Sequence, residues 1–276
     1  MFGTIFRSTA LAAVAVIAVS FSHVPAAYAQ AAKDYAPTEG QDGKDVIWLP
    51  TASTLVDKML NMAKITPQDF VIDLGSGDGR TVITAARRGT AALGIEYNPE
   101  MVEFAKKRAA AAGVAGKASF MKADIFESDF SKASVITMFL LPEINMRLRP
   151  KLLALKPGTR IVSNSFDMED WRADQVAEAD SGCVNYCIAY MWIVPANFAG
   201  SWKTPDGELK LTQKFQYVSG TFSTGNVTTP IKDGKVSGDV LAFSAGGKEY
   251  SLKIGPDGLE GLEISSKAFK ATRSNP

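Results

Sequence analysis

The segment "VIDLGSGDGRTVITAARRG", Val71–Gly89, joins an apolar run to a helical pattern through three glycines at alternate positions: Gly75, Gly77 and Gly79. A strand ending near Leu74, a glycine turn and a helix beginning near Arg80 form the usual crevice for an anionic or nucleoside ligand at the carboxyl edge of a parallel sheet. The segment therefore predicts an α/β fold with a ligand-binding turn.

The surrounding sequence extends this pattern, because short β-branched runs alternate with helical ones. We expect a helix near Thr54–Ala63 and another that begins at Asn98 and Pro99 and ends at Gly113. The expected strands are Phe70–Leu74, Ala92–Glu96, Ser119–Lys122, Val135–Leu140 and Arg160–Ser165. With a terminal hairpin made by Gln175–Ala179 and Cys187–Val194, they predict a seven-stranded, Rossmann-like sheet.

Helical periodicity ends after Pro195, where Leu209, Leu211, Phe215 and Tyr217 mostly alternate with polar residues. Turn dipeptides recur at Asp206-Gly207, Asp233-Gly234, Gly246-Gly247 and Asp257-Gly258. Such dipeptides are strong hairpin signals. We therefore expect an appended small antiparallel β-domain, a barrel or a sandwich, over residues 197–276.

The N-terminus has the pattern of a secretory signal peptide: Arg7, the apolar run Thr9–Phe21, and "AAYAQ" before a cleavage site between Ala29 and Gln30. A transmembrane anchor is the alternative, but thirteen apolar residues are fewer than the roughly 20 that a bilayer requires. We expect a periplasmic or secreted protein without stable membrane insertion after cleavage. Residues 1–29 are then the signal peptide, 30–45 a linker and 46–196 the α/β domain.

Composition excludes several classes of function. The chain is 46% hydrophobic and 21% charged, which suits a globular protein. Cleavage would leave 29 basic and 29 acidic side chains, so we expect no nucleic-acid partner. It would also remove His23, the only histidine, which excludes a Ser-His-Asp triad and the usual histidine-ligated zinc sites. We expect no metal.

Cys183 and Cys187 are the only cysteines. In a straight strand their Cα atoms would lie about 13 Å apart, so a disulfide requires a turn between them. Two buried or free thiols are the alternative.

The glycine spacing separates two ligand classes. A dinucleotide motif needs a third glycine where Arg80 stands, whereas alternate glycines with Asp73 ahead of them resemble class I S-adenosylmethionine (SAM) methyltransferases. The resemblance implies SAM as cofactor. Asp73 would then hold the loop or the ammonium group, and Glu96 the ribose hydroxyls. The implied cofactor-binding residues are Asp73, Gly75, Ser76, Gly77, Gly79 and Glu96, with Asp124 and Ile125 beside the adenine.

The resemblance narrows at "DLGSGDGR", "GIEYNP", "VIWLPTASTLVDKML" and "ASVITMFLLPEINMRLRPKLLALKPGTRIVSNSFDMEDW". Over Val46–Trp171 these segments are similar to the mitochondrial protein-lysine methyltransferases that modify the adenine nucleotide translocase and the c-type subunit of ATP synthase, and to their bacterial relatives. The resemblance implies N-methylation of protein lysine. The signal peptide and the β-domain depart from the mitochondrial pattern.

Amine methyltransferases often carry Asp/Asn-Pro-Pro-Tyr/Phe after the fourth strand, where this chain has Leu140-Leu141-Pro142-Glu143. We expect Leu141 and Pro142 to shape the substrate pocket and Glu143 to orient the amine or take its proton. The alternative for Glu143 is a helix-start carboxylate favoured by the helix dipole. Phe139, Phe166 and Trp171 are candidate pocket walls.

Two other functions remain open. An exported protein would need a supply of SAM, so one alternative is a non-enzymatic SAM- or nucleoside-binding module whose β-domain recognises a partner. The other is a methyltransferase that acts on a small-molecule acceptor.

Overall fold

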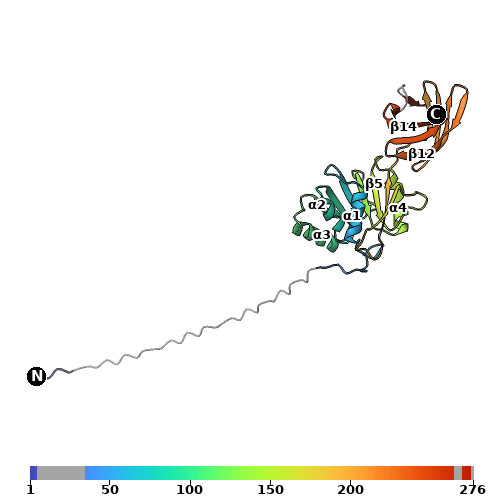
Figure 1. Cartoon of the computed structure of the whole chain (residues 1–276). Coiled ribbons are helices and arrows are strands. Elements are labelled where there is room, and N and C mark those ends of the chain that lie inside the picture. Colours follow the sequence, from blue (N-terminus) through green and yellow to red (C-terminus); the bar gives the residue numbers. More distant parts are fainter. Residues whose placement is uncertain (5–34, 264–268, 275–276) are drawn as a thin grey trace. The chain divides into compact units, whose positions relative to one another are not determined.

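A computed structural model describes residues 1–4, 35–263 and 269–274 (Figure 1). The residues from Tyr35 onward form one compact unit. The expected signal peptide falls almost entirely outside the described residues, so it stays a prediction. Within the described part of the chain, no helix is long and apolar enough to cross a membrane.

The first domain contains a seven-stranded sheet in the order β3-β2-β1-β4-β5-β7-β6, as predicted. The strands from β1 to β5 are parallel, and β7 pairs antiparallel with both β5 and β6. The strands are β1 (Phe70–Leu74), β2 (Ala91–Glu96), β3 (Ala118–Lys122), β4 (Val135–Met138), β5 (Arg160–Asn164), β6 (Gln175–Glu178) and β7 (Ile188–Ile193). Strand β4 ends two residues earlier than expected, which leaves Phe139 and Leu140 in the loop that follows it.

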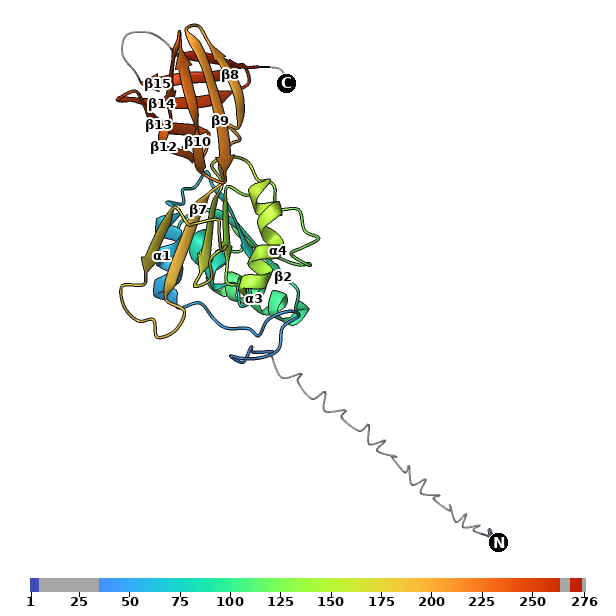
Figure 2. The same cartoon turned by 90° about the vertical axis from the view of Figure 1, so that its right-hand side faces the viewer.

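The four helices of this domain are α1 (Ser53–Met62), α2 (Arg80–Arg87), α3 (Pro99–Ala111) and α4 (Pro142–Leu153). Helices α1, α2 and α3 pack on one face of the sheet and α4 on the other (Figure 2). The predicted start of α3 is confirmed, because the Asn98 side chain accepts hydrogen bonds from the backbone N–H groups of Glu100 and Met101. Both faces of the sheet are thus buried, as its continuous apolar strands require.

The second domain is antiparallel, as predicted, and its sheet closes on itself. The order β10-β12-β13-β14-β15-β16-β8-β9 returns to β10 through the β9–β10 pairing, and β11 extends from β10. Leu209 and Leu211 point into its core with Trp202, Leu241 and Phe243. The strands are β8 (Gly200–Thr204), β9 (Gly207–Lys214), β10 (Tyr217–Thr224), β11 (Val227–Pro230), β12 (Lys232–Ser237), β13 (Val240–Ala245), β14 (Lys248–Gly255), β15 (Gly258–Glu263) and β16 (Lys270–Arg273).

The prediction of one hairpin turn in this barrel is wrong. Asp233-Gly234 lies inside β12, where the register against β13 shifts between Lys232 and Lys235. Asp233 has a φ of 54°, which is the left-handed conformation that an Asp-Gly pair favours both in a hairpin turn and in a bulge. The dipeptide predicts the local backbone correctly but does not distinguish the two contexts.

The loop between β6 and β7 settles the alternatives left open for the cysteines. Cys183 and Cys187 form a disulfide, with their Cα atoms 5.8 Å apart. The turn that the disulfide requires includes Tyr186, whose φ of 58° is also left-handed. A bulky aromatic residue is uncommon in that conformation.

The barrel contacts the first domain at the turn between β9 and β10 and at β12. The ring of Phe215 stacks on Trp171 with 5.8 Å between centroids, and the Gln216 side chain donates to the Arg172 carbonyl. Lys235 pairs with Asp174 at 2.9 Å. Trp171 is fully buried, so it belongs to the core rather than to a pocket wall, contrary to expectation.

Candidate functional site

A pocket lies at the carboxyl ends of the parallel strands, where the glycine turn predicts it. Its wall combines the turn after β1, the end of β2, the loops after β3 and β4, and a segment that precedes α1. We call that segment, Gln41–Thr51, the N-terminal strap. The topology explains the site, because parallel strands deliver their C-terminal loops to one edge of the sheet.

The glycine turn is held by backbone hydrogen bonds to β2 and by close packing. The N–H groups of Gly75 and Ser76 both donate to the Ile95 carbonyl, at 2.9 and 3.1 Å. A Cβ atom on Gly77 would lie 2.4 Å from the indole nitrogen of Trp48, and one on Gly79 would lie 2.6 Å from the Phe120 ring. Because these two glycines lack a Cβ atom, the indole of Trp48 in the strap and the ring of Phe120 in β3 can pack against the turn.

Asp73 lies at the bottom of the pocket, at the end of β1. The residue is 6% exposed, and its carboxylate accepts a 2.6 Å hydrogen bond from Thr137, its neighbour on β4. Burial raises the pKa of Asp73 to about 7; the Thr137 hydrogen bond opposes this rise and the nearby carboxylates of Asp78 and Glu96 add to it. A cation that enters the pocket would favour the ionised form of Asp73.

Glu96 ends β2, and its carboxylate is already oriented. One oxygen accepts from the Gly77 N–H and the other from the Asn98 N–H, each at 2.9 Å. Each oxygen retains a further acceptor site, so the carboxylate can accept the two ribose hydroxyls that the resemblance to SAM methyltransferases implies for it.

Asp124 and Ile125 both line the pocket at the loop after β3, where the resemblance to SAM methyltransferases implies the adenine. Asp124 accepts a hydrogen bond from Lys44 of the strap, and this bond is the main reason that its pKa is lowered, with the Phe126 N–H contributing. The Lys44 ammonium also lies 4.9 Å from the centroid of the Tyr97 ring. Lys44 thus ties the strap across the pocket.

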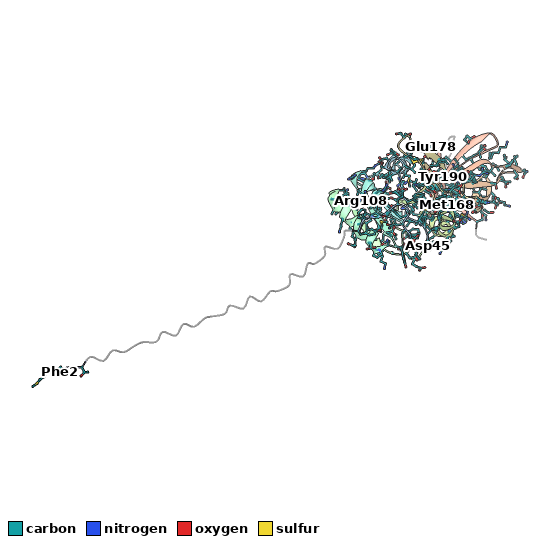
Figure 3. The ribbon with its side chains drawn as sticks, turned by 90° about the horizontal axis from the view of Figure 1, so that it is seen from below. Phe2, Asp45, Arg108, Met168, Glu178 and Tyr190 are labelled. Carbon is teal, nitrogen blue, oxygen red and sulfur yellow. A yellow bond between two sulfur atoms is a disulfide. The ribbon has the colours of Figure 1, made fainter. Side chains whose placement is uncertain are left out.

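Sequence reasoning missed two supports of this site. Asp78, buried inside the glycine turn, pairs with Arg80 at 2.8 Å and with Arg108 of α3, which is labelled in Figure 3. Arg80 also donates to the Thr51 carbonyl and so joins the turn to the strap. The second support is Trp48. The position of Asp78 between two of the glycines could have indicated its role from the sequence. No local pattern indicates that Trp48 packs on the turn.

The expected acceptor residues divide into two groups. Phe139 lines the pocket. Leu141, which is 37% exposed, Pro142 and Glu143 form the start of α4, outside the pocket lining. Glu143 is exposed in the first turn of that helix. Its catalytic role stays a prediction.

Comparison with known proteins gives this fold and pocket a family. Residues 73–175 match the domain described as the ANTKMT methyltransferase domain. Over 152 residues the chain is 41% identical to a protein-lysine N-methyltransferase from Saccharolobus islandicus (strain REY15A), and the match covers 54% of this chain and 94% of that relative. The chain belongs to the ANTKMT methyltransferase family.

Two further proteins are similar to this methyltransferase. It is 35% identical over 128 residues to a lysine N-methyltransferase of Mus musculus that is named for the C-type subunit of ATP synthase, with 46% of this chain and 51% of the mouse protein covered. It thus spans about half the length of that relative. The crystal structure of an RNA methyltransferase from Salinibacter ruber in complex with S-adenosyl-L-homocysteine is 41% identical, with a TM-score of 0.51 and coverage of 54% and 96%.

The pocket of this methyltransferase fits SAM, which carries a sulfonium and an ammonium group. Its lining contains six acidic side chains and two basic ones, Lys44 and Arg80, and both bases are paired with acids. The hydroxyl of Ser76 is buried in the lining without a hydrogen-bond partner among the described residues. An acidic pocket with an unsatisfied hydroxyl and two oriented carboxylates suits a cationic ligand rich in polar groups. The methyltransferase is SAM-dependent.

Proposed function

We propose that the acceptor of this SAM-dependent methyltransferase is the side-chain amine of a lysine in a protein. The observation that carries the proposal is the match to a protein-lysine N-methyltransferase, which extends over almost the whole of that relative. The apolar loop after β4 supports it, because Phe139 lines the pocket on the side that the family places next to the acceptor.

Different residues of the chain would bind different parts of the cofactor in such a reaction. Asp73 would hold the ammonium group of the cofactor, Glu96 its ribose, and Asp124 with Ile125 the adenine ring. SAM supplies an electrophilic methyl group. No covalent intermediate with the protein is required, so alignment of the amine provides much of the rate.

The amine must be neutral when it accepts the methyl group. A lysine has a pKa of about 10.4 in water, and an apolar environment lowers this value because it disfavours the ammonium form. Phe139 and Phe166, whose rings stack with 6.2 Å between centroids, provide such an environment. Glu143 is the candidate to orient the ammonium and receive its proton, because it is the carboxylate next to Leu141 and Pro142.

We also propose that residues 1–29 are removed and that the mature protein begins at Gln30 in the periplasm or outside the cell. The signal-peptide pattern supports this location, as does the Cys183–Cys187 disulfide, since disulfides persist mainly in oxidising compartments. Mass spectrometry of the native protein decides it, and an intact Met1 in a cytoplasmic fraction would contradict the proposal.

The experiment for the acceptor is transfer of radiolabelled methyl from SAM into extracts. We expect label that protease releases and ribonuclease leaves in place. Label removed by ribonuclease would favour RNA as the acceptor, the substrate for which the Salinibacter ruber protein is named, although the balanced charge of the chain beyond residue 29 offers no general attraction for RNA. Label only in small molecules would favour the small-molecule alternative. Absence of label despite SAM binding would favour the non-enzymatic module.

A further inference from the structure

Three aromatic rings from three separate loops meet beside the cofactor pocket. Phe139 follows β4, Phe166 follows β5, and Tyr186 lies in the disulfide loop between β6 and β7, the gold loop of Figure 2. Their ring centroids are 6.2 Å apart for Phe139 and Phe166, 5.3 Å for Phe139 and Tyr186, and 5.9 Å for Phe166 and Tyr186. We call these three residues the aromatic triad.

The triad is continuous with the pocket but extends toward solvent. Phe139 belongs to the pocket wall, whereas Tyr186 is 45% exposed. Core rings of this domain behave differently, since Trp171 and Trp192 are fully buried. Apolar rings that continue from the pocket wall toward solvent form a surface against which an incoming apolar chain would be buried.

The backbone holds Tyr186 in place at an energetic cost. Its φ is left-handed, and the Cys183–Cys187 disulfide closes the loop around it. Ser165, next to Phe166, is also left-handed, and its N–H donates to the Ile188 carbonyl at 2.7 Å, which joins the two ring-bearing loops. Left-handed non-glycine residues belong to the strained conformations that cluster at functional sites.

We propose that the aromatic triad is the subsite for the substrate lysine, and that the disulfide presents Tyr186 to it. This inference rests on the proposed function. The aliphatic stem of a lysine packs against the rings, and the incoming ammonium form docks against a ring face through the attraction between a cation and a π system. Its proton then passes to Glu143, because only the neutral amine accepts the methyl group. Methylated forms of lysine keep this cation and bury more apolar surface. The same rings therefore tolerate successive methylation.

The test compares variants of one loop in the full chain. Tyr186→Ala removes the ring, Tyr186→Phe keeps it, and Val184→Ala is the matched control, because Val184 is 92% exposed in the same loop and lies outside the triad. We expect Tyr186→Ala to reduce methyl transfer to the labelled protein fraction at least tenfold, with SAM affinity within twofold of wild type. Tyr186→Phe and Val184→Ala should remain within threefold.

The disulfide is tested separately. Reduction of the wild type, or the double variant Cys183→Ser and Cys187→Ser, should lower transfer severalfold, and a reductant should not slow the double variant further. Retention of wild-type transfer in both cases would overturn the role of the disulfide. A loss of SAM affinity in Tyr186→Ala equal to its loss of transfer, or wild-type transfer by this variant, would overturn the subsite.

An equilibrium measurement separates this inference from the proposed function. N-acetyl-lysine methylamide, and its norleucine analogue without the amine, are titrated by nuclear magnetic resonance into the full chain saturated with S-adenosylhomocysteine. We expect wild type to bind the lysine compound and Tyr186→Ala to bind it at least tenfold more weakly. Such binding without any transfer to lysine would refute the function and leave the subsite standing. No binding by wild type, or equal binding of the norleucine analogue, would overturn the subsite.

Discussion

The contact between Gly77 and Trp48 makes a quantitative prediction about the cofactor pocket. In Gly77→Ala, the new Cβ atom would lie 2.4 Å from the Trp48 indole nitrogen, and the backbone would keep a φ of 51°. The left-handed backbone alone costs about 1–2 kcal/mol for alanine. The close contact adds about 1 kcal/mol, the low end for overpacking, because Trp48 is only half-buried and lies on a segment without helix or strand. We expect a total destabilisation of roughly 2–3 kcal/mol.

Two variants isolate the contribution of the contact. Gly113→Ala is the backbone control, since Gly113 has a φ of 71° and a Cβ there would meet no atom within 4 Å. It should cost only about 1–2 kcal/mol. In a Trp48→Ala background, the destabilisation caused by Gly77→Ala should fall to that same value. The coupling energy between the two positions is then about 1 kcal/mol.

Urea unfolding measures the stabilities, and calorimetry measures the affinity for SAM. Displacement of the indole by Gly77→Ala should weaken SAM binding at least tenfold, or about 1.4 kcal/mol, while Gly113→Ala leaves it within twofold. Additive effects of Gly77→Ala and Trp48→Ala on stability, or unchanged SAM affinity in Gly77→Ala, would refute the idea that the turn is bare to admit Trp48.

Three other predictions concern pH, catalysis and domain organisation. Because the pKa of Asp73 is raised to about 7, its ionised form is lost below pH 7, and SAM affinity should fall up to tenfold per pH unit there. Without ligand, the stability of wild type relative to Asp73→Asn should increase as the pH falls from 7 toward 4, because protonation of Asp73 then favours the folded state. Parallel pH profiles for wild type and Asp73→Asn would contradict both expectations. Glu143→Gln should leave SAM affinity unchanged and slow transfer by roughly 10²-fold, the scale of a positioned acid–base group, whereas equal losses of both would indicate a structural role. A chain ending at Ala199 should bind SAM within threefold of the full protein, because no residue beyond Ile144 lines the pocket. It should melt at a lower temperature, because Trp171 loses its contact with Phe215. A folded product without SAM affinity would show that the barrel completes the site.

Much of the fold could be predicted because its signals are local. The strand from Phe70 to Leu74 and the glycine turn follow from residue type and spacing, and the cap at Asn98 follows from its side chain. The end of β4 and the bulge at Asp233 were missed, since the same residues suit a strand end, a turn or a bulge equally well. Propensity describes the local backbone and leaves its tertiary setting open.

The candidate site was predictable where one strand end supplies each residue, and less so where distant segments meet. Asp73 and Glu96 end neighbouring parallel strands, so their place in one pocket follows from the sheet order. The approach of Trp48 to Gly77 and of Tyr186 to Phe139 depends on long-range packing that no spacing encodes. The disulfide stayed open for the same reason, because its formation depends on the turn at Tyr186.

The most direct test of the account identifies the methylated atom. The full chain is incubated with methyl-labelled SAM and an extract, the labelled protein is hydrolysed to amino acids, and the products are separated and identified by mass spectrometry. We expect label in mono-, di- or trimethyllysine with the wild type, and loss of that label with Glu96→Ala, whose pocket lacks the carboxylate proposed to hold the ribose. Label recovered in another amino acid, or methyllysine formed equally by wild type and Glu96→Ala, would contradict it.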